Sequence, residues 1–450
     1  MKHRDLTTGT IWKNILYLAL PTMFAMLLQT SFNIVDTIYV GRISAQAIAA
    51  ISLTFPVVFL MISLASGIGI GTTSFIARLI GAKQIKKASE VAKHALLISL
   101  FLYVLFCTTG LIFGRQLFLL MGASQELLPL VLSYANIIFI GSVFLFVAFI
   151  GNSILRGEGD MKTPMIVMAI SAILNIILDP FLIFGIGFFP RLEVMGAALA
   201  TVIARCIAML YILQHLFKNK ALVVVNFKDF KFDFSIIKEI FRVGIPSSLN
   251  QMAMSIGMIL LIKITSLFGE NAIAAYGLAF RLDGFAIMPI FGISHAILTI
   301  VGHNIGAHNI KRAKKTTWTG CLMASSFMGF FGILFFLNSN LAIRIFTNNL
   351  EVIAFGVSYL KIAALTYFFI AISVIIGASF QGAGKGIPAL VLTFIRVIIL
   401  AVPLAYIFSI PIGYEVRGIW LGIAVSNVLA GLFSILWFKI VNFRISHAVI

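Results

Sequence analysis

Residues 164–188 read PMIVMAISAILNIILDPFLIFGIGF, an apolar stretch that contains one charged side chain, Asp179. A helix needs about 20 predominantly apolar residues to cross the hydrocarbon core of a bilayer, so this stretch predicts a membrane-spanning helix. An ionisable side chain within the hydrocarbon core costs about 3 kcal/mol on insertion scales, and an acid at such a depth indicates a functional site. The stretch therefore predicts both the class of fold and a candidate site.

Similar apolar runs fill the rest of the chain. Of its 450 residues 61% are hydrophobic and 11% are charged, and the mean hydropathy is +1.09. Soluble domains have about a quarter of their residues charged. The alternation typical of β-barrels is absent, so helices are the form that satisfies the backbone in lipid. We expect an all-α polytopic membrane protein with twelve transmembrane helices, at about residues 14–40, 46–73, 94–114, 127–151, 164–188, 195–217, 236–265, 272–301, 317–338, 351–378, 387–411 and 417–439.

The basic residues divide unequally between the two sides of these helices. Of 33 Lys and Arg residues, 23 lie in the loops and tails of one side, five lie in the loops of the other side, and five lie inside helices. An excess of Lys and Arg marks the cytoplasmic side, which predicts a multi-pass protein of the plasma (inner) membrane with both termini in the cytoplasm. The net charge of +18 therefore reflects orientation in a bilayer, and it does not indicate nucleic-acid binding.

The two halves of the chain repeat each other at an offset of 225 residues, which aligns Pro21 with Pro246 and Gly67 with Gly292. Each half contains six predicted spans, an even number, so both halves start on the same side of the membrane. Parallel repeats of this kind occur in secondary transporters. We expect six-helix lobes at residues 1–217 and 236–450 around a central cavity, joined by a polar cytoplasmic linker at residues 218–235.

The two acids within the predicted spans of the first half have no counterpart in the second half. Asp36 aligns with Leu261, and Asp179 aligns with Leu404. Scaffold residues are shared between the halves, whereas these acids are not, so the symmetry is broken where chemistry is needed. Both acids are predicted at a similar depth, near the outer ends of their helices.

Amide and hydroxyl side chains accompany these two acids. Asn33 lies three residues before the first acid and Asn175 lies four residues before the second, so each helix presents an amide and a carboxylate on one face. Thr201 on the next helix can complete an oxygen-rich pocket. Two nearby carboxylates in a low dielectric cannot both ionise cheaply, so such a pair can bind and release a proton or hold a small hard cation.

Three segments resemble the multidrug and toxic compound extrusion (MATE) family, and in particular its DinF-like branch. They are Asn33–Thr37 followed by Val40 and Gly41, Ile154–Asp160, and Leu174–Pro180 together with Gly196–Thr201. The resemblance implies export of amphipathic, often cationic organic compounds, driven by inward H⁺ or Na⁺. It also implies that Asp36, Asn175, Asp179 and Thr201 form a cation site of the N-terminal lobe, and that Pro21 lets the first helix bend.

Further charged residues lie within the predicted spans. Arg205 lies one turn after Thr201, where an inward-pointing guanidinium would oppose Na⁺ binding. Arg281 and Asp283 can neutralise neighbours or line the cavity. Lys361 and Arg396 can contact an anionic substrate, form ion pairs, or extend toward the interface.

The sequence contains no ATP-binding motif, metal cluster or nucleophile motif, so we expect no enzyme activity and no cofactor beyond the coupling ion. We expect a monomer that needs no ATPase subunit and takes H⁺ as its main driving ion, with Na⁺ as the alternative. A lipid-linked oligosaccharide flippase of the same superfamily is the rival function, because intramembrane Arg and Lys side chains would suit its phosphates.

Overall fold

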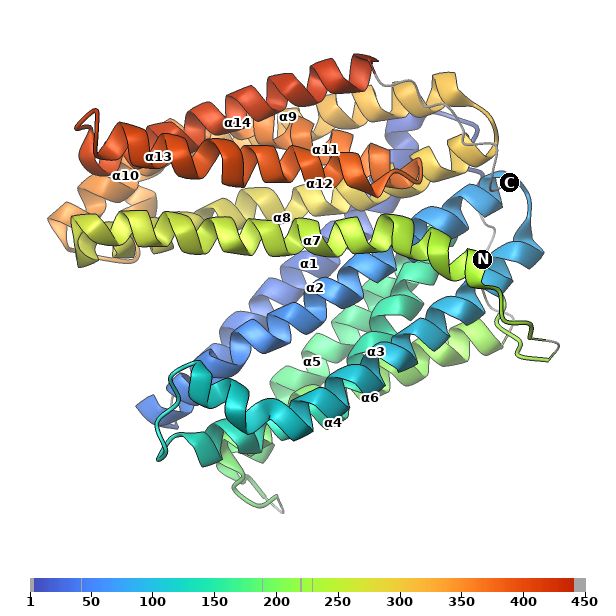
Figure 1. The fold of residues 1–450 in the computed structure, drawn as a ribbon, viewed down its shortest axis with the longest axis horizontal. Coiled ribbons are helices and arrows are strands. Elements are labelled where there is room, and N and C mark those ends of the chain that lie inside the picture. The colour runs from blue at the N-terminus through green and yellow to red at the C-terminus, as the bar shows by residue number, and fades with distance from the viewer. Residues whose placement is uncertain (1–3, 42, 188, 219–220, 229, 441–450) are drawn as a thin grey trace. The chain divides into compact units, whose positions relative to one another are not determined.

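The protein is all-helical in the part of the chain that the structure describes (Figure 1). This computed structural model describes residues 4–41, 43–187, 189–218, 221–228 and 230–440, and it describes the backbone alone for residues 30–38, 40, 41 and 45. The helices of the first half are α1 (Ile11–Gly41), α2 (Ala45–Gly81), α3 (Ile85–Leu120), α4 (Leu128–Glu158), α5 (Lys162–Phe184) and α6 (Glu193–Phe217).

The helices of the second half follow a segment without regular structure. They are α7 (Phe234–Thr265) with the short η1 (Ser266–Phe268), α8 (Glu270–Gly306), α9 (Ile310–Arg344), α10 (Leu350–Ala364), α11 (Tyr367–Gly382), α12 (Gly386–Phe394), the π-helical η2 (Ile395–Ala401), α13 (Val402–Ser409) and α14 (Glu415–Ile440). Within the described residues, eleven helices are long and apolar enough to cross a membrane, and α10 with α11 forms a twelfth, broken span bent by 56°. The predicted class of fold is confirmed.

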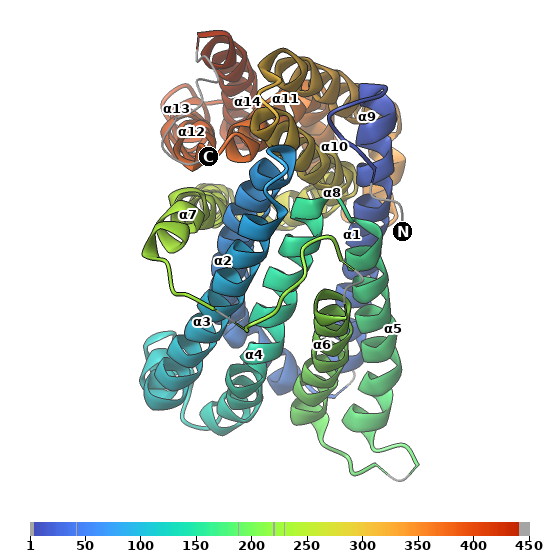
Figure 2. The same cartoon turned by 90° about the vertical axis from the view of Figure 1, so that its right-hand side faces the viewer.

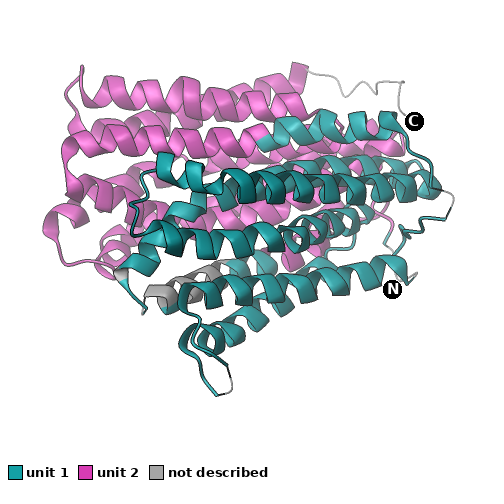
Figure 3. Ribbon diagram, turned by 60° about the horizontal axis from the view of Figure 1, so that its bottom comes forward, with its two compact units in different colours: residues 1–4, 24–248 teal, residues 5–23, 249–450 magenta. Residues whose placement is uncertain are grey.

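The chain packs as two compact units, and each unit is interrupted in sequence (Figure 3). Unit 1 comprises residues 1–4 and 24–248, whereas unit 2 comprises residues 5–23 and 249–450. The first part of α1 therefore belongs to the second unit, and the first half of α7 belongs to the first unit. The predicted lobes at residues 1–217 and 236–450 mark the sequence repeat and remain a prediction.

In unit 1, α7 crosses α2 at a very short distance. A Cβ atom added at Gly67 of α2 would lie 2.5 Å from the backbone nitrogen of Ser248, and one added at Gly71 would lie 2.3 Å from the carbonyl oxygen of Ile240. Real Cβ contacts are longer than this. Small residues let helix backbones approach closely in membranes, and here glycine is what permits the approach.

Unit 2 contains the repeat equivalent of this crossing, between α8 and the start of α1. A Cβ atom added at Gly292 would lie 3.0 Å from the backbone nitrogen of Met23 and 3.1 Å from the carbonyl oxygen of Ala19. Gly292 corresponds to Gly67 at the offset of 225 residues, and Met23 corresponds to Ser248. The internal repeat is therefore visible in the helix contacts of each unit.

Candidate functional site

The candidate site of unit 1 lies between α5 and α6, which run side by side (Figure 2). Gly196 near the start of α6 makes this close packing possible, because a Cβ atom there would lie 2.4 Å from the carbonyl oxygen of Leu182 on α5. Asn175 and Asp179 of α5 and Thr201 of α6 are all buried, and Asp179 has no exposed surface. The two helices thus remove one acid, one amide and one hydroxyl from solvent together.

Hydrogen bonds join these three side chains into one cluster. The Asn175 amide lies 3.3 Å from Thr201 Oγ1. With the amide oriented to satisfy both of its atoms, Nδ2 donates to Asp179 Oδ2 at 3.0 Å and Oδ1 accepts from Thr201 Oγ1 at 3.3 Å. The orientation of an amide is assigned from such partners. Asn175 therefore bridges the acid to the next helix, as the predicted grouping of these residues requires.

Pro180 follows the acid directly and lies inside α5. Proline has no backbone N–H, so the carbonyl of Ile176 one turn earlier lacks its usual helical donor. This carbonyl adds a further oxygen to the neighbourhood of Asp179.

The other predicted half of the site lies on α1. Asn33 and Asp36 fall within the helix, but their side chains lie outside the described residues, so their convergence with Asp179 stays a prediction. Carboxylate and hydroxyl oxygens are the donors that hard cations prefer. In the described part, however, the Asn175 nitrogen faces Asp179, which leaves the carboxylate and Thr201 Oγ1 as the side-chain oxygens for an ion, beside the carbonyl of Ile176.

The two other predicted positions of this region are on the described helices. Pro21 lies inside α1, two residues before the point where this helix passes from unit 2 to unit 1. Pro246 has the same relation to the passage of α7 from unit 1 to unit 2. Arg205 lies on α6 one turn after Thr201 and is half-buried.

The charged residues predicted within unit 2 do not form one group. Arg281 and Lys361 are exposed, and Arg396 is half-buried within the π-helical η2. Asp283 is buried and accepts hydrogen bonds from Tyr359 and Tyr367. The structure shows no ion pair between Arg281 and Asp283 within the residues it describes, so the acid is stabilised by hydroxyl groups.

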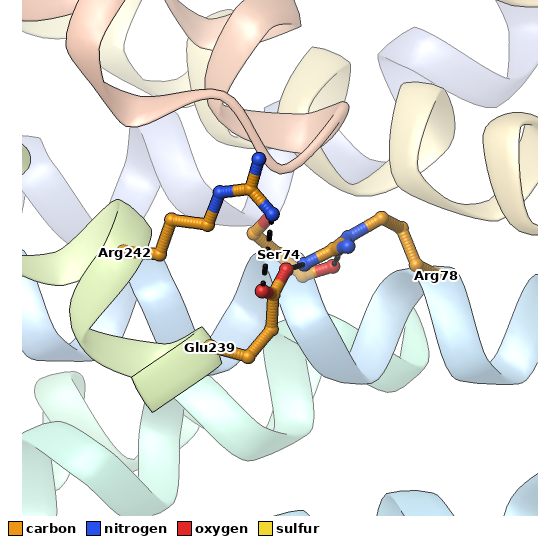
Figure 4. Close-up of polar contacts among 4 residues, drawn as sticks. All are labelled: Ser74, Arg78, Glu239 and Arg242. Carbon is orange, nitrogen blue, oxygen red and sulfur yellow. Dashed lines mark hydrogen bonds and ion pairs between the residues drawn. The ribbon is translucent and has the colours of Figure 1, made fainter. Parts of the chain in front are cut away.

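One ion cluster was not predicted as a site (Figure 4). Glu239 of α7 accepts from Arg78 of α2 at 2.9 Å, and its other carboxylate oxygen lies 3.5 Å from Arg242 Nη1. Arg78 Nε also donates to the carbonyl oxygen of Ser74 at 3.3 Å. In the sequence, both arginines indicated only the orientation of the chain in the membrane. The signal available was Glu239 itself, an acid near the basic start of an apolar helix.

The predicted linker also makes specific contacts in its described part. The Val223 N–H donates to Glu158 Oε2 at 2.8 Å, and the Asp233 N–H donates to His94 Nε2 at 2.8 Å. The ring of Phe230 packs on the ring of His94. This segment is therefore attached to α3 and α4 of unit 1.

Comparison with known proteins gives consistent matches over nearly the full chain. The MatE family model matches residues 21–181 and 246–407, two ranges whose starts differ by the repeat offset. The chain is 30% identical over 440 residues to the FAD transporter of Shewanella oneidensis (96% of this chain, 95% of that protein). It is 29% identical over 439 residues to the probable multidrug resistance protein YoeA of Bacillus subtilis (96% and 95%). A solved structure described as the outward-facing conformation of a multidrug resistance MATE family transporter of the MOP superfamily superposes with a TM-score of 0.92 at 34% identity, covering 98% of this chain and 97% of that chain.

Proposed function

Because this chain belongs to the MATE family of multi-pass membrane transporters, we propose that it is an antiporter that exports amphipathic, often cationic organic compounds in exchange for protons. Transport of small molecules follows from the family, whereas the direction, the substrate class and the ion are our proposal. The observation that carries it is the buried cluster of Asn175, Asp179 and Thr201.

The donor set of this cluster favours a proton over Na⁺. A proton needs one carboxylate oxygen, whereas a hard metal cation needs a shell of several oxygen ligands. Among the described side chains, the carboxylate of Asp179 and the hydroxyl of Thr201 are the oxygens left for an ion. Asp36 would add a second carboxylate. Arg205, one turn beyond Thr201, adds positive charge to the region, which opposes a metal cation more than it opposes protonation.

Proton binding would act on the conformation through α1. Protonation removes the negative charge of the acids and weakens their hold on a cationic substrate. Proline inside a helix removes a hydrogen bond and lets it bend, and Pro21 stands two residues from the passage of α1 between the units. The populations of the straight and bent states then follow their different affinities for the proton.

The setting of the transporter completes the proposal. The distribution of Lys and Arg supports a plasma (inner) membrane location with cytoplasmic termini. A monomer suffices, and no ATPase subunit is needed, because the ion gradient supplies the energy. Assignment to the DinF-like branch remains a prediction.

Two other substrate classes deserve direct comparison. One relative is named an FAD transporter, and FAD is an aromatic compound with an anionic pyrophosphate. The exposed Arg281 and Lys361 and the half-buried Arg396 would suit such a substrate or the phosphates of a lipid-linked oligosaccharide. An assay must therefore include an anionic substrate beside a cationic one.

The decisive experiment measures efflux from proteoliposomes under an imposed ΔpH or ΔNa⁺, with a fluorescent organic cation and with FAD. We expect cation export that follows ΔpH without added Na⁺. Asp179→Asn and Asp36→Asn should each abolish it, whereas Leu404→Met, at the repeat equivalent of Asp179, should retain it. Transport that requires Na⁺ and ignores ΔpH would overturn the proton assignment. Transport of FAD alone would overturn the substrate class.

A further inference from the structure

Unit 2 contains a second buried acid, in a setting unlike that of Asp179. Asp283 lies on α8 and is 6% exposed. Tyr359 of α10 donates to its Oδ2 at 2.6 Å, and Tyr367 of α11 donates to its Oδ1. Each carboxylate oxygen thus accepts one hydroxyl group, the arrangement that an ionised carboxylate prefers.

The two tyrosines stand on opposite sides of the break in one transmembrane span. The helix α10 ends at Ala364, α11 begins at Tyr367, and the two are bent by 56°. Thr366 at the break donates to the carbonyl oxygen of Ala363 at 2.9 Å and accepts from Asn427 at 3.3 Å. A single carboxylate on a neighbouring helix therefore holds both halves of the broken span.

Aromatic rings enclose this acid. Tyr276 stacks on Trp420 with ring centroids 5.5 Å apart, and Tyr359 meets the same indole edge-on at 5.0 Å. The Trp420 Nε1 is buried and has no hydrogen-bond partner in the described structure. The rings of Tyr276, Tyr359 and Trp420 are themselves buried, so the acid has an apolar, aromatic surround.

The chemistry of the surroundings fits a proton as the ligand. The described residues include no group of three or more His, Cys, Asp or Glu side chains placed to hold a metal ion. The titratable groups that face Asp283 are Tyr276, Tyr359 and Tyr367. On the helices around it, Glu270, Arg281, Arg344, Glu351, Lys361 and Arg417 are exposed, Arg312 and Lys314 of α9 are half-buried, and His303 of α8 is buried. No ion pair with Asp283 occurs among the described residues, so no nearby cation fixes its charge.

We propose that Asp283 is a proton-binding group of unit 2, and that its protonation releases one tyrosine and changes the angle between α10 and α11. A proton from water adds to one carboxylate oxygen and turns it into an O–H donor. That oxygen has lost its negative charge and is a weaker acceptor, so the hydrogen bond from the tyrosine that donated to it weakens. At the repeat offset Asp283 corresponds to Val58, so unit 1 has no such device.

The first test follows the protonation of Asp283 through tryptophan fluorescence and needs no transport. Its failure can therefore be distinguished from failure of the proposed antiport. The chain has four tryptophans, and Trp12→Phe, Trp318→Phe and Trp437→Phe leave Trp420 as the reporter. In nanodiscs without substrate, we expect its emission to change in one single-proton step between about pH 4 and pH 9, the range over which buried carboxyl groups titrate. Asp283→Asn should abolish the step.

Two tyrosine variants keep the proposal testable if Asp283→Asn does not fold. Tyr359→Phe and Tyr367→Phe keep the rings but each removes a donor to the ionised carboxylate, so each should move the step by about tenfold in proton concentration toward higher pH. Asp179→Asn should leave the step in place. A flat emission profile in the parent, or an unchanged step in Asp283→Asn, would overturn the proposal.

The second test measures the bend. Spin labels at the exposed positions Leu350, the first residue of α10, and Ile387, on α12 just beyond the end of α11, bracket the broken helix in a background without Cys107, Cys206 and Cys321. We expect the distance between them to differ above and below the midpoint of the optical step, and to stop responding in Asp283→Asn. A control pair at Leu322 and Leu337 on α9 should not respond. A pH-independent distance in the parent would refute the link to the break.

Discussion

The crossing of α2 with α7 in unit 1 and the crossing of α8 with α1 in unit 2 both bring helix backbones close together. They differ in the polar interactions that stabilise them. In unit 1 the crossing of α2 and α7 ends in the ion cluster of Arg78, Glu239 and Arg242. At the offset of 225 residues, Arg78 corresponds to His303 and Glu239 to Asn14. The acid of this ion pair is therefore replaced by an amide in the other half.

Unit 2 holds its crossing through backbone carbonyl groups instead. Arg312 Nη2 donates to the carbonyl oxygens of Thr8 and Gly9 at 2.7 Å each, and Asn14 Nδ2 donates to Thr8 at 2.9 Å. Asn304 Nδ2 reaches the carbonyl of Leu6 at 3.3 Å. The comparison teaches that the repeat preserves the shape of the contact, while each unit stabilises it with different chemistry.

The largest loss of stability should follow from removing the Glu239 carboxylate from the crossing in unit 1. Glu239→Ala leaves the Arg78 guanidinium, which is 15% exposed, without its partner, and breaking a buried pair in this way costs about 3–5 kcal/mol. We expect a clear drop in the thermal unfolding midpoint of the purified protein. The double variant Arg78→Met with Glu239→Leu should recover most of it, because the charge that remains, on Arg242, is half exposed to solvent. Arg191→Ala, which breaks an ion pair with Glu193 in which both side chains are exposed, is the control and should have little effect.

The second-largest loss of stability should follow from a change in the distance between the backbones of α2 and α7. Gly71 corresponds to Ala296, so the crossing in unit 1 is tighter by one methyl group. Gly71→Ala places a methyl 2.3 Å from the Ile240 carbonyl and should destabilise unit 1 by about 2 kcal/mol through overpacking. Gly277→Ala, where nothing lies within 4 Å, is the control for the substitution itself. Equal unfolding midpoints for the two variants would remove the claimed difference in tightness.

A smaller effect is expected at the neutral counterpart of Glu239. Asn14→Ala removes one hydrogen bond to the Thr8 carbonyl, and a net loss of about 1 kcal/mol is typical of such a bond. Arg312 still holds the same segment. The measurement is again the thermal unfolding midpoint, and a loss as large as that of Glu239→Ala would show that the two crossings depend equally on this position.

The smallest loss of stability should follow from lowering the pH. Asp5 and Asp233 precede α1 and α7 and accept hydrogen bonds from Thr7 and Ser235, and these bonds lower the pKa of both carboxyl groups. A lowered pKa stabilises the fold above the unfolded value near 4 and loses that contribution as the pH falls through the folded value. We expect a slight, equal loosening of both helix starts below about pH 4, visible as faster amide exchange at Thr7 and Ser235. Asp5→Ala and Asp233→Ala should already show it at neutral pH.

The sequence predicted the spans, the repeat and the grouping on α5 because each depends on local spacing. Asn175 and Asp179 are four residues apart, and any helix places them together. It did not predict the partners of Asp283, since Tyr359 and Tyr367 sit in apolar runs where tyrosine is an ordinary packing residue. Nor did it predict the pairing of Arg78 with Glu239. These residues are 161 positions apart in the chain, and only the packing of α2 against α7 brings them together.

Each unit consists of two separated segments of the chain, and this affects the order in which the units can fold during synthesis. Residues 5–23 leave the ribosome before unit 1 is complete, yet the residues they pack against, 249–450, leave only after it. Unit 1 needs nothing beyond Ser248 and can complete its packing while the chain is still being synthesised. The start of α1 must meanwhile remain without its final partners for most of the synthesis. Domains generally fold as they emerge, but here the N-terminal helix can finish folding only with the C-terminal half.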